Sequence, residues 1–339
     1  MEHDQPRIRI AVDAMGGDFA PKNVVAGAIG ALRQRGSQLS IVLVGSEPAI
    51  RSELHLIGSS DLAFEIVNAS QVIDMHDGAT AGLKQKKDSS ISVGIMLQKE
   101  GKADAFVSAG HTGAVMSAST LILGRIEGVS RPTIGAFLPT ESGVCLLVDA
   151  GANVDCKPQH LLEFGIMGSI YSREMLNIKN PTVGLLNIGE ESSKGNDVSL
   201  ETHQLLSKSR LNFIGNIEGR DILKGTADVV VCDGFVGNVV LKFAESLLDI
   251  MKAKFRQHAS QDIFKKLWVG MMYGTLRKIL RGFDYQEYGG VPLLGINGVS
   301  IIGHGNSTPK AIKHMILNAE NVVRRNINQR IQEALVTSK

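Results

Sequence analysis

The chain has 339 residues, of which 43% are hydrophobic and 21% charged, with a formal net charge of +2. This composition is ordinary for a globular protein and argues against disorder away from the two ends. A nearly neutral chain without a long basic stripe is not typical of nucleic-acid-binding proteins, so no nucleic-acid partner is expected. No apolar run approaches the ~18 residues that a spanning helix needs, so any membrane contact is expected to be peripheral.

The cysteines indicate a reducing environment. Cys145, Cys156 and Cys232 form an odd set without a CxxC pair or a metal-ligand spacing with histidine. The first residues, 1–6, are polar and lack the positive start and apolar run of a secretory signal. A cytoplasmic location is therefore expected.

In chain order, short glycine-bounded runs rich in valine, isoleucine and leucine predict strands at residues 8–12, 41–44, 64–67, 105–107, 144–148, 183–187, 212–214, 229–231 and 300–302. Segments of helical period lie between most of them, at residues 23–33, 89–99, 113–123, 161–175, 199–207 and 309–334. This alternation predicts an α/β protein, a three-layer α/β/α sandwich with a mainly parallel sheet. Because no repeat or low-complexity linker interrupts it, residues 7–339 are predicted to form a single domain.

One stretch departs from the alternation. Strand signals stop at residues 241–288, where two helical patterns follow one another and predict a protruding helical hairpin. Basic and aromatic residues are interleaved in its second half, and the side chains that we assign to a membrane or dimer contact are Phe264, Trp268, Met271, Met272 and Tyr273. Two interpretations stay open, a dimer arm whose apolar face packs on its twin and a surface that docks on a membrane, and both hold if the arm presents its tip to lipid.

Glycine-rich loops follow five of the predicted strands, at residues 13–18, 108–113, 187–196, 233–238 and 303–308. Ligands of open parallel sheets bind beyond the carboxyl ends of the strands, so we expect the five loops to lie on one edge and to line one pocket. Backbone N–H groups of glycine and helix N-termini favour an anion, although a plain strand-to-helix turn is the alternative for each loop. The predicted phosphate- or substrate-binding residues are Asp13, Gly16, Gly17, Ser108, Gly110, His111, Thr112, Gly113, Asp233, Gly237 and His304.

Common cofactor motifs do not occur. The sequence has neither a GxGxxG that opens a helix after the first strand nor a GxxxxGK[ST], which weakens a redox or kinase function. It has no HExxH and no carboxylate-rich loop with calcium or magnesium spacing. We therefore expect no cofactor and no essential metal.

Several segments together resemble one family. They are residues 10–18 followed by Ala20-Pro21, then residues 86–90, 108–113, 148–153 and 234–242. Together they are similar to the phosphate acyltransferase of bacterial phospholipid synthesis, the PlsX family, and the likeness extends from about Arg7 to the last helix. One departure is His111, where relatives usually carry asparagine; both side chains can donate a hydrogen bond.

The resemblance implies a reversible reaction in which an acyl-carrier-protein thioester and inorganic phosphate give acyl phosphate and free carrier. A membrane glycerol-3-phosphate acyltransferase would then consume the product. It also implies a homodimer and a fold similar to isocitrate and isopropylmalate dehydrogenases and to phosphotransacetylase.

Two residues are predicted to be catalytic. Lys194 matches the lysine that the family uses in catalysis and can hold phosphate, the alternative being a solvated surface lysine. Asn238 matches a family active-site residue and can donate its amide to phosphate or to the carbonyl oxyanion, the alternative being a helix N-cap. Three secondary candidates for orienting phosphate or moving a proton are Asp13, Asp233 and His304. For His304 a purely structural role is an equal alternative.

A basic loop precedes the helix predicted near Ser89. Lys84, Lys86 and Lys87 crowd this loop, and acyl carrier proteins are acidic, so the loop is predicted to dock the carrier, the alternative being a solubilising run. Cys232 next to Asp233 suggests an acyl-enzyme, but it lies in an apolar strand run, which favours direct attack by phosphate.

Three competing functions remain from the sequence. The nearest is a phosphotransacetylase-like enzyme that uses a coenzyme A thioester. The others are a dehydrogenase of the related fold and a non-catalytic, membrane-associated scaffold for lipid-synthesis enzymes.

Overall fold

One mixed sheet runs through the described part of the chain, which comprises residues 6–59, 62, 64–261, 271, 274 and 289–337 of this computed structural model. Its strands are β1 (Ile8–Asp13), β2 (Leu39–Gly45), β3 (Glu65–Asn68), β4 (Ala105–Ser108), β5 (Thr133–Thr140), β6 (Gly143–Val148), β7 (Thr182–Leu186), β8 (Asn212–Ile217), β9 (Val229–Val231), β10 (Val291–Leu294) and β11 (Ser300–Ile302). The order across the sheet is β3-β2-β1-β4-β11-β10-β5-β6-β9-β7-β8.

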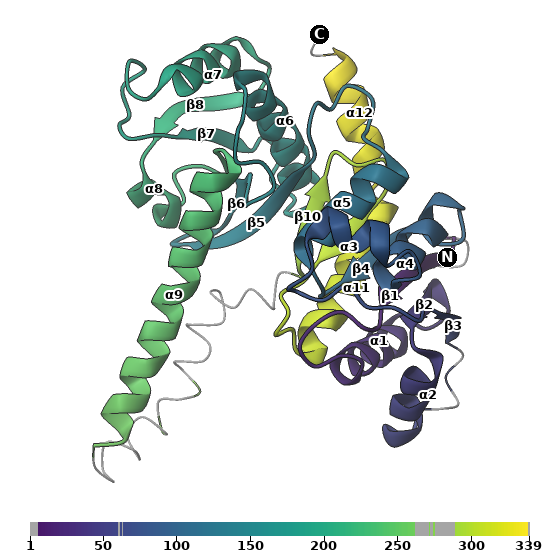
Figure 1. Cartoon of the computed structure of the whole chain (residues 1–339). Helices are drawn as coiled ribbons and strands as arrows, with labels where there is room; N and C mark the ends of the chain where they lie inside the picture. The colour runs from purple at the N-terminus through teal and green to yellow at the C-terminus, as the bar shows by residue number, and fades with distance from the viewer. Residues whose placement is uncertain are drawn as a thin grey trace, which may run out of the picture.

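Helices connect these strands (Figure 1). They are α1 (Lys22–Arg35), α2 (Glu47–Leu56), α3 (Ala79–Gln85), α4 (Ser90–Lys99), α5 (Thr112–Ala118), α6 (Pro158–Met175), α7 (Asp197–Lys208), α8 (Gly219–Lys224), α9 (Gly234–Ala259), α11 (Pro309–Arg324) and α12 (Ile327–Thr337), with a 3₁₀ turn η1 (Gly36–Gln38) and a π-helical turn η2 (Ser119–Leu123). Most of the expected elements are present, and the α/β class with a mainly parallel sheet is confirmed.

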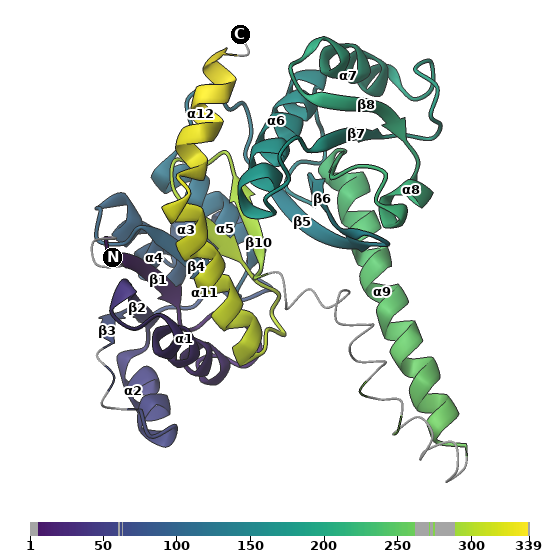
Figure 2. The ribbon, with the colours of Figure 1, turned by 180° about the vertical axis from the view of Figure 1, so that it is seen from behind.

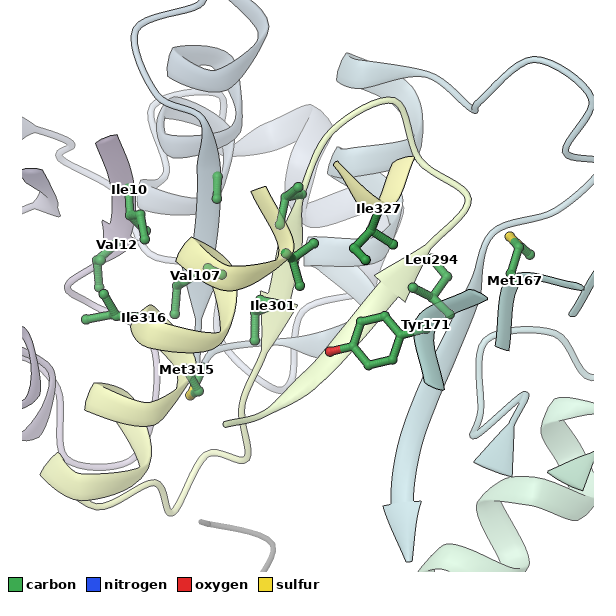
Figure 3. Close-up of a cluster of buried hydrophobic side chains, with 14 of the residues drawn as sticks. Ile10, Val12, Val107, Met167, Tyr171, Leu294, Ile301, Met315, Ile316 and Ile327 are labelled. Atoms are coloured by element: carbon green, nitrogen blue, oxygen red, sulfur yellow. The ribbon is translucent and has the colours of Figure 1, made fainter. Parts of the chain in front are cut away.

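Helices cover both faces of the sheet, as alternate residues of the strands show. Ile10 and Val12 of β1 belong to one buried cluster, whereas Ala11 between them belongs to another. In Figure 3 the first cluster lies between the sheet and α11, whose Met315 and Ile316 are drawn. Helices α4 and α5 lie over the opposite face. Two buried faces explain why the strands are continuous apolar runs.

Two strands were not predicted, and they change the topology. β5 contains Gly135 and Pro139, and β10 contains Pro292, residues that weaken a strand signal. β10 pairs antiparallel with both β11 and β5, and β5 pairs antiparallel with β6. Three reversals therefore separate the first block of parallel strands (β3, β2, β1, β4 and β11) from the second block (β6, β9, β7 and β8), so the two blocks run in opposite directions.

The last predicted helix, residues 309–334, is two helices. Asn326, between α11 and α12, has a φ of 52°, a left-handed conformation that asparagine adopts more readily than most residues. Its backbone N–H donates to the carbonyl of Val323 and so closes the end of α11. The chain then turns into α12, which packs against α6.

Helix α9 extends away from the body of the molecule (Figures 1 and 2). It begins at Gly234, seven residues before the predicted arm, and runs for 26 residues. Of the residues assigned to a membrane or dimer contact, Met271 is described and its side chain is 78% exposed. Phe264, Trp268, Met272 and Tyr273 lie outside the described residues, so the hairpin itself stays a prediction.

Candidate functional site

Three of the predicted loops meet at one edge of the first block. The Ser108 hydroxyl donates to the carboxylate of Asp13 over 2.6 Å, which joins the ends of β1 and β4. Gly303 N–H donates to the Ser108 carbonyl, and Asp18 N–H donates to the Gly305 carbonyl, both over 2.8 Å. These bonds fasten the loop after β11 to the other two. Helices α1, α5 and α11 all begin at this edge, so their positive dipole ends converge there.

Asp13 supports this first loop cluster from inside. Its side chain is only 1% exposed, and its carboxylate also accepts the Met15 N–H over 3.1 Å. Burial raises the pKa of this carboxyl above 3.8, while hydrogen bonds from Ser108 and other neighbours oppose the shift. A group enclosed in this way organises the loop, and its contact with phosphate stays a prediction.

The same loop needs glycine at two positions. A Cβ on Gly16 would lie 2.5 Å from an Asp13 carboxylate oxygen and 2.7 Å from the Gly110 nitrogen. Gly17 has a φ of 105°, which L side chains rarely adopt. Both glycines are therefore explained by the close packing of the loops on each other.

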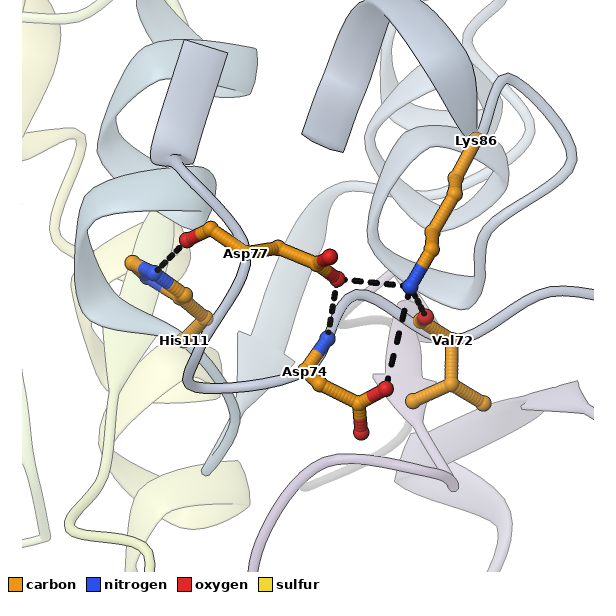
Figure 4. Close-up of polar contacts among 5 residues, drawn as sticks. All are labelled: Val72, Asp74, Asp77, Lys86 and His111. Atoms are coloured by element: carbon orange, nitrogen blue, oxygen red, sulfur yellow. Dashed lines mark hydrogen bonds and ion pairs between the residues drawn. The ribbon is translucent and has the colours of Figure 1, made fainter. Parts of the chain in front are cut away.

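His111 links the second loop to the segment before α3 (Figure 4). Its Nδ1 accepts the Ala114 N–H over 3.2 Å and thereby caps α5. Because Nδ1 is an acceptor, Nε2 is the donor, and it contacts the Asp77 carbonyl at 3.0 Å. Both ring nitrogens are used within the chain. His111 thus positions the loop in this structure, and its contact with phosphate stays a prediction.

Lys86 completes that link. Its ammonium lies 2.6 Å from the Asp77 carboxylate and 2.7 Å from the Val72 carbonyl. The hydrogen bond between the two side chains lowers the pKa of Asp77 and raises that of Lys86. Lys86 is therefore engaged internally, and its part in docking the carrier stays a prediction. Lys84 and Lys87 are exposed.

A second loop cluster lies at the end of β6 and is built on Asp149. One carboxylate oxygen accepts the N–H groups of Gly151 and Ala152, at 3.1 and 3.0 Å, and the other accepts both the backbone and side-chain N–H of Asn153. Burial raises the pKa of Asp149, and these donors oppose the shift. Sequence analysis assigned no role to this aspartate, although an aspartate followed by small residues is a common signal of a side-chain-stabilised turn.

Helix α9 begins in this second cluster. Asp233 is its N-cap and accepts the Val236 N–H over 2.8 Å, so the capping role considered for Asn238 belongs to Asp233. Asn238 lies one turn further, exposed, with its side chain against Gly151. Gly237 packs directly on the Asp149 carbonyl, which a Cβ would approach to 1.8 Å. The amide of Asn238 is thus held at the surface of a tightly packed turn.

Lys194 lies in the loop between β7 and α7, also in the second block. The loop backbone is ordered by a 3.0 Å bond from the Asn187 amide to the Lys194 carbonyl and by the cap that Asn196 provides for α7. The Lys194 side chain is exposed, and within the described part of the chain its ammonium makes no ion pair. It is therefore available to an anion from solution.

The cysteines offer no nucleophile. Cys232 is buried, and desolvation raises the pKa of its thiol well above 9.0. Burial also raises the pKa of Cys145 to about 12 and that of Cys156 to about 11. Because only the thiolate attacks readily, these values support the interpretation that no acyl-enzyme forms.

The two loop clusters follow blocks of strands that run in opposite directions, so the five loops do not all follow parallel strands, as the expectation of a single edge requires. Residues 13–18, 108–113 and 303–308 follow strands of the first block, whereas 187–196 and 233–238 follow strands of the second. The antiparallel strands β10 and β5 between them reverse the direction of the second block.

Comparisons with known proteins identify the family. The sequence matches the family described as fatty acid synthesis protein over residues 8–330. It is 48% identical over 320 residues to a phosphate acyltransferase of Desulforudis audaxviator, covering 94% of each chain. A second phosphate acyltransferase, from Pelobacter propionicus, is 49% identical over 328 residues, covering 97% of this chain and 94% of the relative.

This chain belongs to the phosphate acyltransferase family. Its members are transferases, which confirms the resemblance read from the sequence and the assignment as an enzyme.

Solved structures confirm the fold class of this family member. The EutD phosphotransacetylase from Staphylococcus aureus superposes with a TM-score of 0.60 at 16% identity, covering 93% of this chain and 94% of that chain. A phosphotransacetylase from Streptococcus pyogenes gives 0.60 at 20% identity, covering 98% and 95%. At such identities the likeness concerns the fold alone. The expected similarity to isocitrate and isopropylmalate dehydrogenases stays a prediction.

Among the described residues, no helix is both long and apolar enough to cross a bilayer.

Proposed function

We propose that this chain transfers a fatty acyl group from an acyl-carrier-protein thioester to inorganic phosphate, giving acyl phosphate for phospholipid synthesis. The observation that carries the proposal is the identity of nearly half of the residues, over almost the whole chain, with proteins named phosphate acyltransferase. The exposed ammonium of Lys194 and the exposed amide of Asn238 support it, because the reaction needs an anion site and a hydrogen-bond donor.

In the proposed reaction, a phosphate oxygen attacks the thioester carbonyl carbon and forms the new C–O bond. The carbonyl oxygen becomes an oxyanion, then the C–S bond breaks and the carrier leaves as a thiolate, which takes up a proton. Lys194 would neutralise the phosphate charge, and Asn238 would donate its amide to phosphate or oxyanion. The glycine loops of the first block are the further proposed anion contacts, through their backbone N–H groups.

We extend the proposal to the surroundings of the enzyme. The chain would act as a single-domain homodimer in the cytoplasm, peripherally associated with the membrane, and would hand acyl phosphate to a membrane glycerol-3-phosphate acyltransferase. The length of α9 and its exposed apolar side chains support an intermolecular contact by the predicted arm.

The test measures release of free carrier thiol from palmitoyl-acyl carrier protein, with and without phosphate. Wild type is expected to release thiol only with phosphate, and Lys194→Ala and Asn238→Ala to lose about 10²-fold or more in rate. Lys179→Ala is the matched control, because Lys179 is an exposed loop lysine outside both clusters. Release from palmitoyl-coenzyme A but not from the carrier would instead support the phosphotransacetylase-like function.

A further inference from the structure

An apolar pocket lies beside the first loop cluster, next to the basic loop that is predicted to dock the carrier. It has a volume of about 550 Å³ and is formed by α3, α4 and η2. Its wall is mainly apolar and includes Leu83, Val93, Met96, Leu97, Leu121 and Ile122. This volume lies within the range of small-molecule sites in proteins.

The wall of this pocket is open to water. Leu121 is 69% exposed and Met96 is 43% exposed, although both belong to helical segments that bury their neighbours. Leu121 projects from the π-helical turn η2, a rare irregularity that occurs often at functional sites. An apolar hollow that remains hydrated is favourable for an apolar ligand, because binding removes this surface from water.

The charges at the pocket define the polar end of such a ligand. Lys84 and Lys87 both line the pocket and are exposed, and within the described residues neither makes an ion pair. Glu100 is the acidic residue of the lining. Two ammonium groups beside an apolar wall fit a molecule with a long hydrocarbon chain and an anionic head.

The pocket is joined to the first loop cluster. Thr80 lines it, and the preceding residue Ala79 packs on Gly113, where an added Cβ would lie 3.1 Å from the Ala79 Cβ. The contacts of Asp77 with Lys86 and His111 hold the start of α3 against the same loop. Through Thr80 and its neighbour Ala79, the wall of the pocket is therefore continuous with the packing of residues 108–113.

We propose that this pocket binds the acyl chain of the donor thioester, with Lys84 and Lys87 facing anionic groups of the carrier. This inference rests on the proposed function, which supplies the identity of the ligand, and the pocket supplies its location. It assigns the basic loop a second task, because the same two lysines that would attract an acidic carrier also flank the entrance for its acyl chain.

The first test is direct binding, which does not depend on catalysis. Binding to the full chain of saturated fatty acids from hexanoate to palmitate is measured by competition with a fluorescent long-chain fatty acid. Affinity is expected to rise by up to about four-fold per added methylene until the pocket is filled. Affinity that does not depend on chain length would overturn the proposal.

The matched variants are Leu121→Glu and Leu56→Glu. Leu56, on α2, is 73% exposed, so both substitutions place a carboxylate at an exposed leucine, but only Leu121 lines the pocket. Leu121→Glu is expected to weaken palmitate binding by about ten-fold or more, because it removes apolar contact area and places a charge beside the hydrocarbon chain. Leu56→Glu is expected to leave the affinity for palmitate unchanged. Equal affinities for the two variants, or a change of oligomeric state in Leu121→Glu, would contradict an acyl pocket.

The lysines are tested by comparing two ligands with the same chain. Lys84→Ala/Lys87→Ala is expected to weaken palmitate binding several-fold and to lower its dependence on salt, without the same effect on the corresponding long-chain alcohol. An equal loss for both ligands would remove the lysines from the proposal.

The thiol-release assay separates failure of this inference from failure of the proposed function. If wild type transfers acyl groups but Leu121→Glu has the same ratio of palmitoyl to butyryl turnover, the pocket proposal fails and the function stands. If palmitate binds as expected but no phosphate-dependent release occurs, the function fails and the pocket remains as a site for an anionic amphiphile.

Discussion

At the scale of single residues, Gly237 shows why some positions of the second cluster admit no side chain. An added Cβ would lie 1.8 Å from the Asp149 carbonyl oxygen. This oxygen belongs to the backbone, so it cannot move away as the end of a flexible side chain could. Gly237→Ala is expected to destabilise the protein by about 3 kcal/mol or more, because the start of α9 must move. Urea unfolding measures this.

Gly219→Ala is the control for this prediction. Gly219 begins α8, and no atom lies within 4 Å of an added Cβ there. Similar unfolding midpoints for the two variants would mean that the turn after β9 relaxes easily, and the tight contact would then have no energetic weight.

The raised pKa of Asp13 predicts the direction in which the stability of the protein changes with pH. Its pKa is raised in the folded chain, mainly by burial, so folding favours the protonated carboxyl. Relative to Asp13→Asn, the wild type is expected to gain stability as pH falls from neutral through this raised pKa towards 3.8. Urea unfolding of both proteins across that range gives the difference directly, and a flat difference would show that Asp13 has no shifted pKa.

Comparison of the wild type with Asp77→Asn is expected to show the opposite pH dependence of stability. The pKa of Asp77 is lowered by its hydrogen bond with Lys86, so its contribution to stability is present above pH 3.8 and is lost as pH falls through the folded pKa below that value. The two aspartates therefore distinguish desolvation from pairing within one molecule.

At the scale of elements, substitutions of Asp233 distinguish a helix-capping role of this residue from a catalytic role. As the N-cap of α9 it accepts one N–H group, and asparagine can do the same. Asp233→Asn is expected to retain stability, whereas Asp233→Ala loses about 1 kcal/mol. If Asp233→Asn folds normally but loses acyl transfer, its charge acts in the reaction and the structural assignment is wrong.

The elements also show what the sequence could predict and why. Buried strands such as β1 and β4 are continuous apolar runs, and the loops that follow them contain glycine, so both features were found. β5 and β10 contain proline, and their pairing with each other joins segments that are distant in the chain. The positions of Lys194 and Asn238 at loop and helix starts were predicted, but the use of Asp233 as the cap and of Lys86 as an internal partner depends on side-chain packing that local patterns do not contain.

At the scale of the whole molecule, the reversal between the blocks has a consequence for the site. Lys194 and Asn238 belong to the second block, while the first block carries the loops around Ser108 and the apolar pocket beside them. A reaction that uses groups from both blocks needs their loops to reach one substrate, either within one chain or across the homodimer proposed above.

The exposed face of α9 is where we expect the second chain of this homodimer to pack. Phe235, Val239, Phe243, Leu247, Ile250 and Met251 follow one another at intervals of three or four residues except for one adjacent pair, and each is between 38% and 63% exposed. A helix with this spacing presents one apolar stripe, which in water is stable mainly when it is covered.

Phe243→Glu is expected to raise the dissociation constant of the dimer by at least ten-fold, because it places a charge in the centre of the stripe. Sedimentation equilibrium measures this constant. Arg256→Glu introduces the same side chain at an exposed position on the opposite face of the helix and should leave the dimer intact. A wild type that is monomeric at all concentrations, or equal effects of the two variants, would contradict a dimer contact through this stripe.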